Sequence, residues 1–364
     1  MQSKRNGAID FWRFIFSVVL VLFHTHMMNI YDKYKGGSFP LHKGSLAVEF
    51  FLITSGFLLA ASINRRGDTP FEWEDNWDFI KRKLMTFYPA YLICWTLTFI
   101  AINVVQFKDV ITFVRNLFRS VFEITLIRNA GFDVGRVLPQ AWYLSSMLLV
   151  MFLIYPIYRL DRKRFEYWIA PVIAVLTLGY LCDTTEGLLN PSFDMGFTFK
   201  GNLRALAEIC LGVVCYVFCQ KMKEREFTRL GQHILSLFEL GGYAFAILYM
   251  QYYRRFPDQT QFTVLFFLAI SVTISFSGMS SITPLFDHKI FNLLGRYSLY
   301  PYLTYSLFVE TLPYLFPDMR MKTMIAIYLV LTFLTAALIM AAETAVRKRL
   351  RERKQLRVQA PTEV

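Results

Sequence analysis

Residues 9–28 have the sequence IDFWRFIFSVVLVLFHTHMM, and this stretch decides the fold class. Crossing the ~30 Å hydrocarbon core of a bilayer takes about 20 mostly apolar residues of helix, and this stretch has that length. His24 and His26 interrupt its end, and no small-residue cleavage site follows. We therefore expect a permanent membrane helix and not a cleaved signal peptide.

Similar apolar runs recur along the whole chain. Of its 364 residues 55% are hydrophobic and only 18% are charged, and its mean hydropathy is +0.38. A soluble protein of this length needs more charge to cover its surface, so we predict an all-α integral membrane protein with about ten transmembrane helices. Residues 1–346 are expected to form one polytopic domain, followed by a basic tail at 347–364. The expected spans are 9–28, 46–64, 84–106, 138–158, 166–183, 203–220, 233–251, 262–279, 294–312 and 323–345.

The net charge of +12 lies in clusters between the apolar runs. Examples are Lys81-Arg82-Lys83, Arg162-Lys163-Arg164 and Arg347-Lys348-Arg349, which ten spans place on one side of the membrane. This distribution is typical of the positive-inside rule and of attraction to anionic lipid headgroups, so we expect both termini in the cytoplasm and no nucleic-acid partner. The five cysteines have no zinc-ligand spacing, so no metal site is expected.

Ionisable residues inside a membrane span are costly and point to function. Arg13 and His24 are eleven residues apart. In a helix this is three turns plus about 20°, so both side chains lie on one face, ~16 Å apart along the axis. The alternatives are that Arg13 is a snorkelling anchor paired with Asp10 and that His24 is a hydrogen-bonded packing residue. Their common register favours a catalytic pair.

The second expected span offers a partner for the histidine. Glu49 lies within one turn of the outer boundary, roughly level with His24. A carboxylate there would hold one ring nitrogen and raise the basicity of the other. The alternative is a carboxylate at the rim that faces water. Ser55, followed by Gly56, places a hydroxyl near mid-membrane, but no nucleophile-elbow motif surrounds it.

These residues belong to a series of motifs that resembles the bacterial membrane-bound acyltransferase family 3. The family typically has Asp-x-x-Arg, ten further residues and His at its start. The resemblance covers nearly the whole chain, in the same order. Its landmarks are Asp10 to His24, Phe50-Phe51-Leu52-Ile53-Thr54-Ser55-Gly56-Phe57, the basic stretch Lys81-Arg82-Lys83 before Tyr88-Pro89, Trp142-Tyr143-Leu144-Ser145, and Leu294-Gly295-Arg296-Tyr297-Ser298-Leu299-Tyr300.

The sequence departs from the family pattern at three positions. Met147 stands where many members have Glu, Thr86 where they have Arg, and Tyr305 where they have His. The departures bear on phosphate binding and on the acceptor side. Arg13 and His24 match the pattern.

The resemblance implies an enzyme of the bacterial inner membrane. Family members move an acyl group, most often acetyl, from coenzyme A to a hydroxyl of a surface polysaccharide or lipid-linked sugar. Basic side chains at the inner face suit the phosphates of this donor, although the positive-inside rule explains the same charges. The expected acyl-CoA-binding residues are Arg13, Ser55, Arg65, Arg66, Lys81, Arg82 and Lys83.

In this interpretation His24 acts as general base or as acyl carrier, with Arg13 and Glu49 as the other catalytic residues. Trp142, Tyr143 and Asp10 are expected to contact the acceptor, although the aromatic pair also suits an interfacial anchor. The runner-up function is a transporter or flippase of a glycan or lipid-linked precursor. The oligomeric state stays open.

Overall fold

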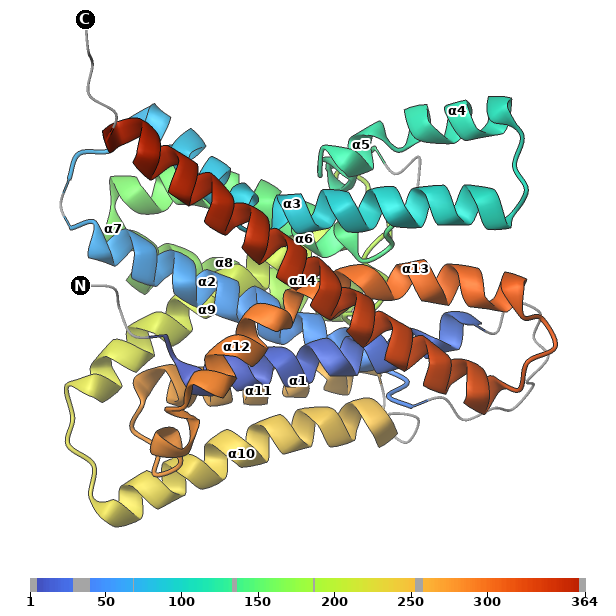
Figure 1. The fold of residues 1–364 in the computed structure, drawn as a ribbon. Helices are drawn as coiled ribbons and strands as arrows, with labels where there is room; N and C mark the ends of the chain where they lie inside the picture. The colour runs from blue at the N-terminus through green and yellow to red at the C-terminus, as the bar shows by residue number, and fades with distance from the viewer. Residues whose placement is uncertain are drawn as a thin grey trace, which may run out of the picture.

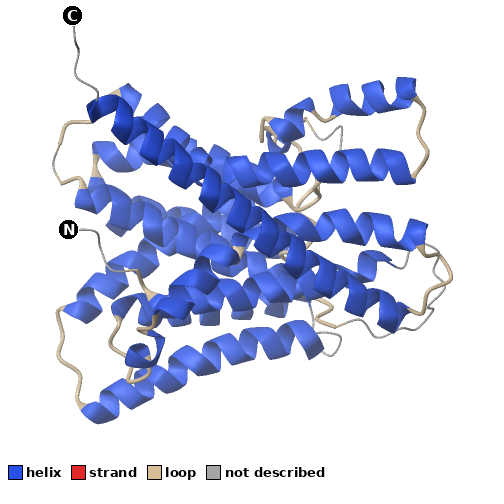
Figure 2. Ribbon diagram, viewed as in Figure 1, coloured by secondary structure: helices blue, strands red, loops and turns tan. Residues whose placement is uncertain are grey.

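The computed structural model describes residues 5–28, 40–67, 69–132, 136–185, 187–252 and 258–359. These residues form helices joined by short loops, and no strand occurs in them beyond an isolated bridge between Asp194 and Phe199 (Figure 2). The α-helices are α1 (Gly7–Phe23), α2 (Ala47–Arg65), α3 (Trp73–Val105), α4 (Val110–Arg119), α5 (Val121–Ile124), α6 (Ala141–Leu160), α7 (Arg162–Arg164), α8 (Ala170–Thr185), α9 (Lys200–Lys223), α10 (Arg229–Tyr252), α11 (Gln261–Ser277), α12 (Lys289–Tyr297), α13 (Leu299–Leu315) and α14 (Met321–Gln359). The shorter turns include η1 (His24–Met28), η2 (Gly44–Leu46), η3 (Arg128–Ala130), the π-helical η4 (Phe165–Ile169), η6 (Asp258–Thr260) and η7 (Thr283–Phe286).

Nine helical segments of the described residues are long and apolar enough to cross a membrane. The all-α membrane fold is therefore confirmed. These segments are Gly7–Met28, Gly44–Arg65, Trp73–Val105, Ala141–Leu160, Arg162–Thr185, Lys200–Lys223, Arg229–Tyr252, Asp258–Ser277 and Met321–Leu350.

The helices run lengthwise through one bundle, which has two ends (Figure 1). We call the end where α1 begins and α14 ends the proximal end, and the opposite end, where α1 runs into η1, the distal end. These names do not depend on the orientation of the bundle in the membrane. That the proximal end faces the cytoplasm stays a prediction.

The ninth expected span, 294–312, is interrupted. Its residues belong to α12 and to α13, which is only 17 residues long and begins after Ser298. Pro301 has no N–H for the carbonyl of Tyr297, so a continuous helix cannot form here. The hydroxyl of Ser17 in α1 donates to the carbonyl of Ser298 (2.6 Å), which ties the break to α1.

Two glycines bring α2 and α9 into backbone contact at the centre of the bundle. A Cβ on Gly56 would lie 2.0 Å from the carbonyl oxygen of Ile209, and a Cβ on Gly212 would lie 2.2 Å from that of Ile53. Small residues are the usual means by which membrane helices approach this closely. The contact sets the position of Glu49 on α2 and Arg204 on α9, one to two turns away.

Residues 107–132 fold back along the distal part of α3 (Figure 1). The Asn116 side-chain amide of α4 donates to the Asn103 side chain (3.0 Å). Further on, the carboxylate of Glu123 accepts the backbone N–H groups of Val137 and Leu138, at 2.9 Å each. The buried carboxylate thereby closes the loop and places the start of α6.

Candidate active site

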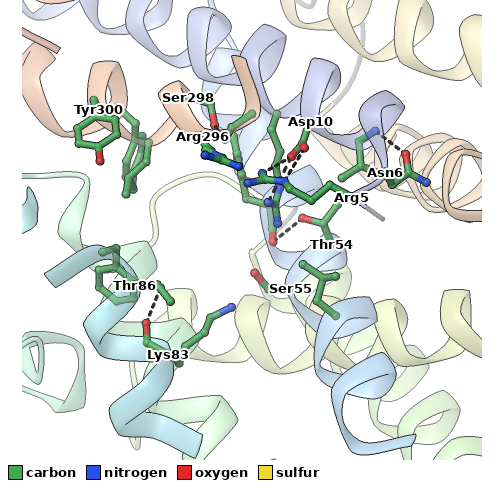
Figure 3. A pocket seen from close by; sticks show the side chains of 18 of the residues that line it. Arg5, Asn6, Asp10, Thr54, Ser55, Lys83, Thr86, Arg296, Ser298 and Tyr300 are labelled. Carbon is green, nitrogen blue, oxygen red and sulfur yellow. Dashed lines mark hydrogen bonds and ion pairs between the residues drawn. The ribbon is translucent and has the colours of Figure 1, made fainter. Parts of the chain in front are cut away.

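A large cavity of about 1690 Å³ opens at the proximal end of the bundle. In Figure 3, Lys83 and Thr86 of α3 face Arg296 and the Arg5–Asp10 pair across it. Three acidic side chains, Asp10, Glu343 and Glu352, line the cavity. Eight basic side chains line it as well: Arg5, Arg13, Arg65, Lys83, Lys223, Arg296, Arg347 and Lys348. The basic side chains outnumber the acidic ones, so the lining has an excess of positive charge.

Asp10 and Arg13 have different surroundings in this cavity. The guanidinium of Arg5 donates to both oxygens of Asp10, at 2.7 and 2.8 Å. Gly295 packs so closely that a Cβ there would lie 2.3 Å from an Asp10 oxygen. Asp10 is thus held by the protein on two sides. The Arg13 guanidinium is 4.0 Å from Asp10, too far for a hydrogen bond, and its side chain keeps 26% of its exposure toward the cavity.

The five basic residues expected at the inner face separate into two groups. Arg65 and Lys83 line the proximal cavity. Arg66 is outside the lining and donates to Asp75 (2.7 Å). Lys81 and Arg82 of α3 are exposed and do not line the cavity. The structure therefore brings only the first two to the cavity.

Ser55 lies on the wall of the proximal cavity, where its hydroxyl is 3.4 Å from that of Tyr143 and 3.4 Å from the sulfur of Met147. Trp142, the neighbour of Tyr143, lines a different cavity. The expected aromatic pair is therefore divided, because adjacent residues on α6 point in different directions. Only Trp142 lies on the side of His24.

This second cavity, of about 580 Å³, opens at the distal end of the bundle. His24, His26 and Trp142 line it together with Gln140 and Arg204. Arg13 and His24 are thus on one helix but at two separate cavities, as the distance between them along α1 requires.

The hydrogen bonds of His24 define its tautomer. Nδ1 lies 2.8 Å from the carbonyl oxygen of Leu20, and a carbonyl only accepts, so Nδ1 carries the proton. In the neutral ring with this tautomer, Nε2 is an acceptor and receives the hydroxyl of Tyr305 (3.0 Å), whose ring stacks on the imidazole with centroids 4.3 Å apart. The neutral ring thus presents a lone pair on Nε2, which is what a base or a nucleophile needs.

The expected contact between Glu49 and His24 is wrong. The carboxylate of Glu49 is fully buried and pairs with Arg204 of α9, whose guanidinium also lies 3.7 Å from Glu208 and 5.1 Å from the centre of the Trp142 ring. The close α2–α9 contact turns Glu49 away from α1. Glu49 therefore holds Arg204 against Trp142, and a carbonyl and a tyrosine orient His24.

A wall only one or two side chains thick separates the two cavities, because Val48 and Tyr302 line both of them. Tyr302 is fixed to Gln140 by two hydrogen bonds. Its hydroxyl donates to the Gln140 carbonyl (2.7 Å), and the Gln140 side-chain amide donates to the Tyr302 carbonyl (3.1 Å). The Gln140 side chain also accepts from Ser306 (2.6 Å), which fixes its orientation.

Several residues of the two cavities were missed by the sequence analysis. Arg296 lies in a family landmark, and Arg347 and Lys348 lie in a basic cluster that the positive-inside rule explained equally well. Tyr305 was noted only as a departure from the family pattern. Its contact with His24 joins residues 281 positions apart, which no local pattern reveals.

The comparison with protein families decides the class. A model of acyltransferase family 3, described as an acyltransferase domain, matches residues 6–343. The chain belongs to acyltransferase family 3. The match includes His24, Arg13 and both wall residues, and it establishes a membrane-embedded acyltransferase. The comparisons with curated proteins and with solved structures gave no match.

Proposed function

We propose that the protein transfers an acyl group, most simply acetyl, from acyl-CoA to a hydroxyl of a cell-surface polysaccharide or lipid-linked sugar. The observation that carries this proposal is the position of His24. His24 lines one cavity, and the Val48–Tyr302 wall separates that cavity from a second, strongly basic one.

The proximal cavity suits the donor. Coenzyme A carries phosphates, and Arg or Lys side chains bind phosphate through charge-assisted hydrogen bonds. Arg13, Lys83 and Arg296 line the interior of the cavity together with Ser55. In a bacterial inner membrane with the proximal end in the cytoplasm, acyl-CoA enters this cavity directly, and its thioester reaches the wall beside Tyr302.

The reaction needs one proton transfer that His24 can perform. As the acceptor oxygen attacks the thioester carbonyl, Nε2 takes the hydroxyl proton. The C–S bond then breaks, and the departing thiolate takes the proton from the imidazolium, which leaves an ester and free coenzyme A. As acyl carrier, Nε2 would itself attack the thioester and expel coenzyme A as its thiolate. The acceptor hydroxyl would then attack the acyl-imidazolium, its proton would pass to the thiolate, and the neutral imidazole would be restored. Both routes require Tyr305 to release Nε2.

The distal cavity suits a carbohydrate acceptor. Its volume of about 580 Å³ lies within the ~300–1,000 Å³ range of small-molecule sites. Trp142 offers an aromatic face, and the side chain of His26 is exposed nearby.

The test uses washed membranes that contain the wild type, His24→Ala or His233→Ala, supplied with acetyl-labelled CoA. His233 is an exposed histidine on α10 that lines neither cavity, so its replacement is a matched control. We expect base-labile label in a glycan or lipid-linked fraction with the wild type and with His233→Ala, and none with His24→Ala. Retained labelling with inserted His24→Ala would contradict the assigned role.

If neither acetyl-CoA nor succinyl-CoA labels any fraction, the alternative hypothesis of a transporter or flippase is tested. The appearance of a lipid-linked sugar on the outer face of the membrane would then be measured.

A further inference from the structure

The wall between the two cavities consists of side chains that have little freedom to move. Val48 and Tyr302 line both cavities, and they are only 4% and 7% exposed. A buried side chain leaves its position only if its helix shifts or its rotamer changes. Both movements are restricted here.

Close contacts hold the backbone of α2 on both sides of Val48. Just before α2 begins, a Cβ on Gly44 would lie 2.5 Å from the Cβ of Phe23 at the end of α1. Further along α2, Gly56 meets the backbone of α9. Between these points, Phe50 stacks on a phenylalanine of α1 with ring centroids 4.7 Å apart. Val48 therefore has a fixed position beside the histidine end of α1.

The two side chains of the wall are themselves stiff. A β-branched residue in a helix has one strongly preferred χ1 rotamer, so the methyl groups of Val48 cannot turn out of the wall without strain. The other wall residue, Tyr302, is fixed to Gln140 by two hydrogen bonds, and its ring meets that of Tyr143 edge-on with centroids 6.2 Å apart. The boundary between the cavities therefore has a fixed size.

A rigid boundary limits the size of the group that is transferred across it. In the proposed reaction the thioester carbonyl must reach the wall, because the acceptor hydroxyl lies in the distal cavity. The pantetheine arm of the donor extends back toward the proximal mouth, so the acyl chain is the part that points into the wall. Each added methylene needs space that a wall side chain occupies. One methylene more or less in such a site changes kcat/KM by about 10–200-fold.

We propose that Val48 determines the length of the acyl group: its two methyl groups leave room for acetyl and discriminate against longer acyl chains. This rests on the proposed function, since it describes the donor of that same site. The bonds that change are the same for every donor. The C–S bond of the thioester breaks, the ester C–O bond forms, and the hydroxyl proton ends on the thiol of coenzyme A. Val48 contacts the unreactive end of the acyl group, so it selects the donor and takes no part in proton transfer.

The test compares donors of increasing chain length in the membrane assay. Acetyl-, propionyl-, butyryl- and hexanoyl-CoA, each labelled in the acyl group, are supplied below their KM, and the base-labile ester is measured. Released coenzyme A is not the readout, because a widened wall also admits water. With the wild type we expect kcat/KM to fall about tenfold or more for each methylene between acetyl and butyryl. Equal values for acetyl and butyryl would overturn the proposal.

Variants of Val48 change the width of the wall in both directions. Val48→Ala removes both methyl groups, and we expect its butyryl-to-acetyl ratio of kcat/KM to rise about tenfold or more above the wild-type ratio. Val48→Ile adds a methyl group and should lower the propionyl-to-acetyl ratio. The matched control is Val264→Ala on α11, which loses two equally buried methyl groups but lines neither cavity, so it should keep the wild-type ratios. Because each ratio compares two donors on one protein, a partial loss of folded protein cancels.

The outcomes separate this proposal from the proposed function. Transfer of acetyl and butyryl with ratios that neither Val48 variant changes would keep the acyltransferase and remove the role of Val48. If Val48→Ala does not insert, Val48→Ile decides, because its expected shift has the opposite sign. A third variant, Val48→Thr, keeps the branched shape and should keep the wild-type ratios; a shift there would assign the selection to polarity and contradict selection by size. No ester from any donor with inserted wild-type protein would remove the proposed function and this inference together.

Discussion

At the scale of single residues, His24 depends on two partners of different kinds. The carbonyl of Leu20 lies one turn earlier on the same helix, so the backbone itself determines which ring nitrogen is protonated. Tyr305 comes from α13 and contributes both a stacked ring and a hydroxyl. Substitution at Tyr305 can separate the ring from the hydroxyl, which makes it the informative position.

We expect Tyr305→Phe to keep kcat/KM within about tenfold of the wild type. The stacked ring and the Leu20 bond still orient the imidazole, and one neutral hydrogen bond contributes only about 1 kcal/mol. Tyr305→Ala removes the ring as well, and a misplaced catalytic group costs about a hundredfold in rate. Both values come from acyl-transfer kinetics in membranes. Equal losses in the two variants would mean that the hydroxyl itself takes part in proton transfer.

Glu49→Gln should impair stability before it impairs chemistry. The substitution removes a charge that the buried guanidinium of Arg204 needs, and breaking one side of a buried ion pair costs about 3–5 kcal/mol. We expect a lower Tm for purified Glu49→Gln. Arg204 also pairs with the buried Glu208, so only the triple variant Glu49→Gln, Glu208→Gln, Arg204→Met removes every charge of the cluster, and it should recover much of the loss. An unchanged Tm with lost activity would instead return Glu49 to a catalytic role.

The sequence alone could predict Arg13 and His24 because one helix relates them. The positions follow from 100° and 1.5 Å per residue, and the structure places both side chains at cavities. The partner of Glu49 lies 155 residues away on α9, and its choice depends on how two helices pack. A single sequence contains no signal for that packing. The predicted contact between Glu49 and His24 was argued only from their similar depth in the membrane, and it was wrong for this reason.

At the scale of elements, the contact of α2 with α9 determines which side of α2 faces the cavities. Hydropathy gave the spans of both helices to within a few residues, but it could not indicate the backbone contact at Gly56 and Gly212. It also missed the break at Ser298, where Pro301 ends the hydrogen-bond ladder in a run that is apolar enough on average to be read as one span. Hydropathy locates the apolar segments, whereas the contacts between helices and the breaks within them depend on three-dimensional geometry.

Gly56→Ala should therefore prevent normal folding or insertion. Its Cβ would meet the carbonyl oxygen of Ile209 at 2.0 Å, and backbone cannot move aside as a flexible side chain can. Overpacking costs about 1–3 kcal/mol where side chains yield, and more is expected here. The matched control is Gly241→Ala on α10, where nothing lies within 4 Å and alanine should be neutral or favourable. Yield and Tm of the purified proteins give the comparison, and equal values would contradict the packing argument.

At the scale of the whole molecule, the wall between the cavities matters because it separates two environments. In the proposed reaction the thioester arrives from one end of the bundle and the acceptor from the other, so the two would meet only at Val48 and Tyr302. A permanent opening would admit water to the thioester whenever the acceptor is absent. Gln140, which holds Tyr302 by two hydrogen bonds, keeps the wall closed.

Tyr302→Ala should join the cavities and uncouple the reaction. We expect hydrolysis of acyl-CoA without acceptor to rise severalfold, measured as free coenzyme A thiol, while labelled product falls. Tyr302→Phe keeps the ring in place and loses only the bond to the Gln140 carbonyl, so its hydrolysis should stay near the wild-type level. Hydrolysis that also requires His24, shown by the Tyr302→Ala, His24→Ala double variant, would indicate that water replaces the acceptor at the same base. If Tyr302→Ala transfers acyl groups normally and hydrolyses none, the two cavities do not meet at this wall during the reaction.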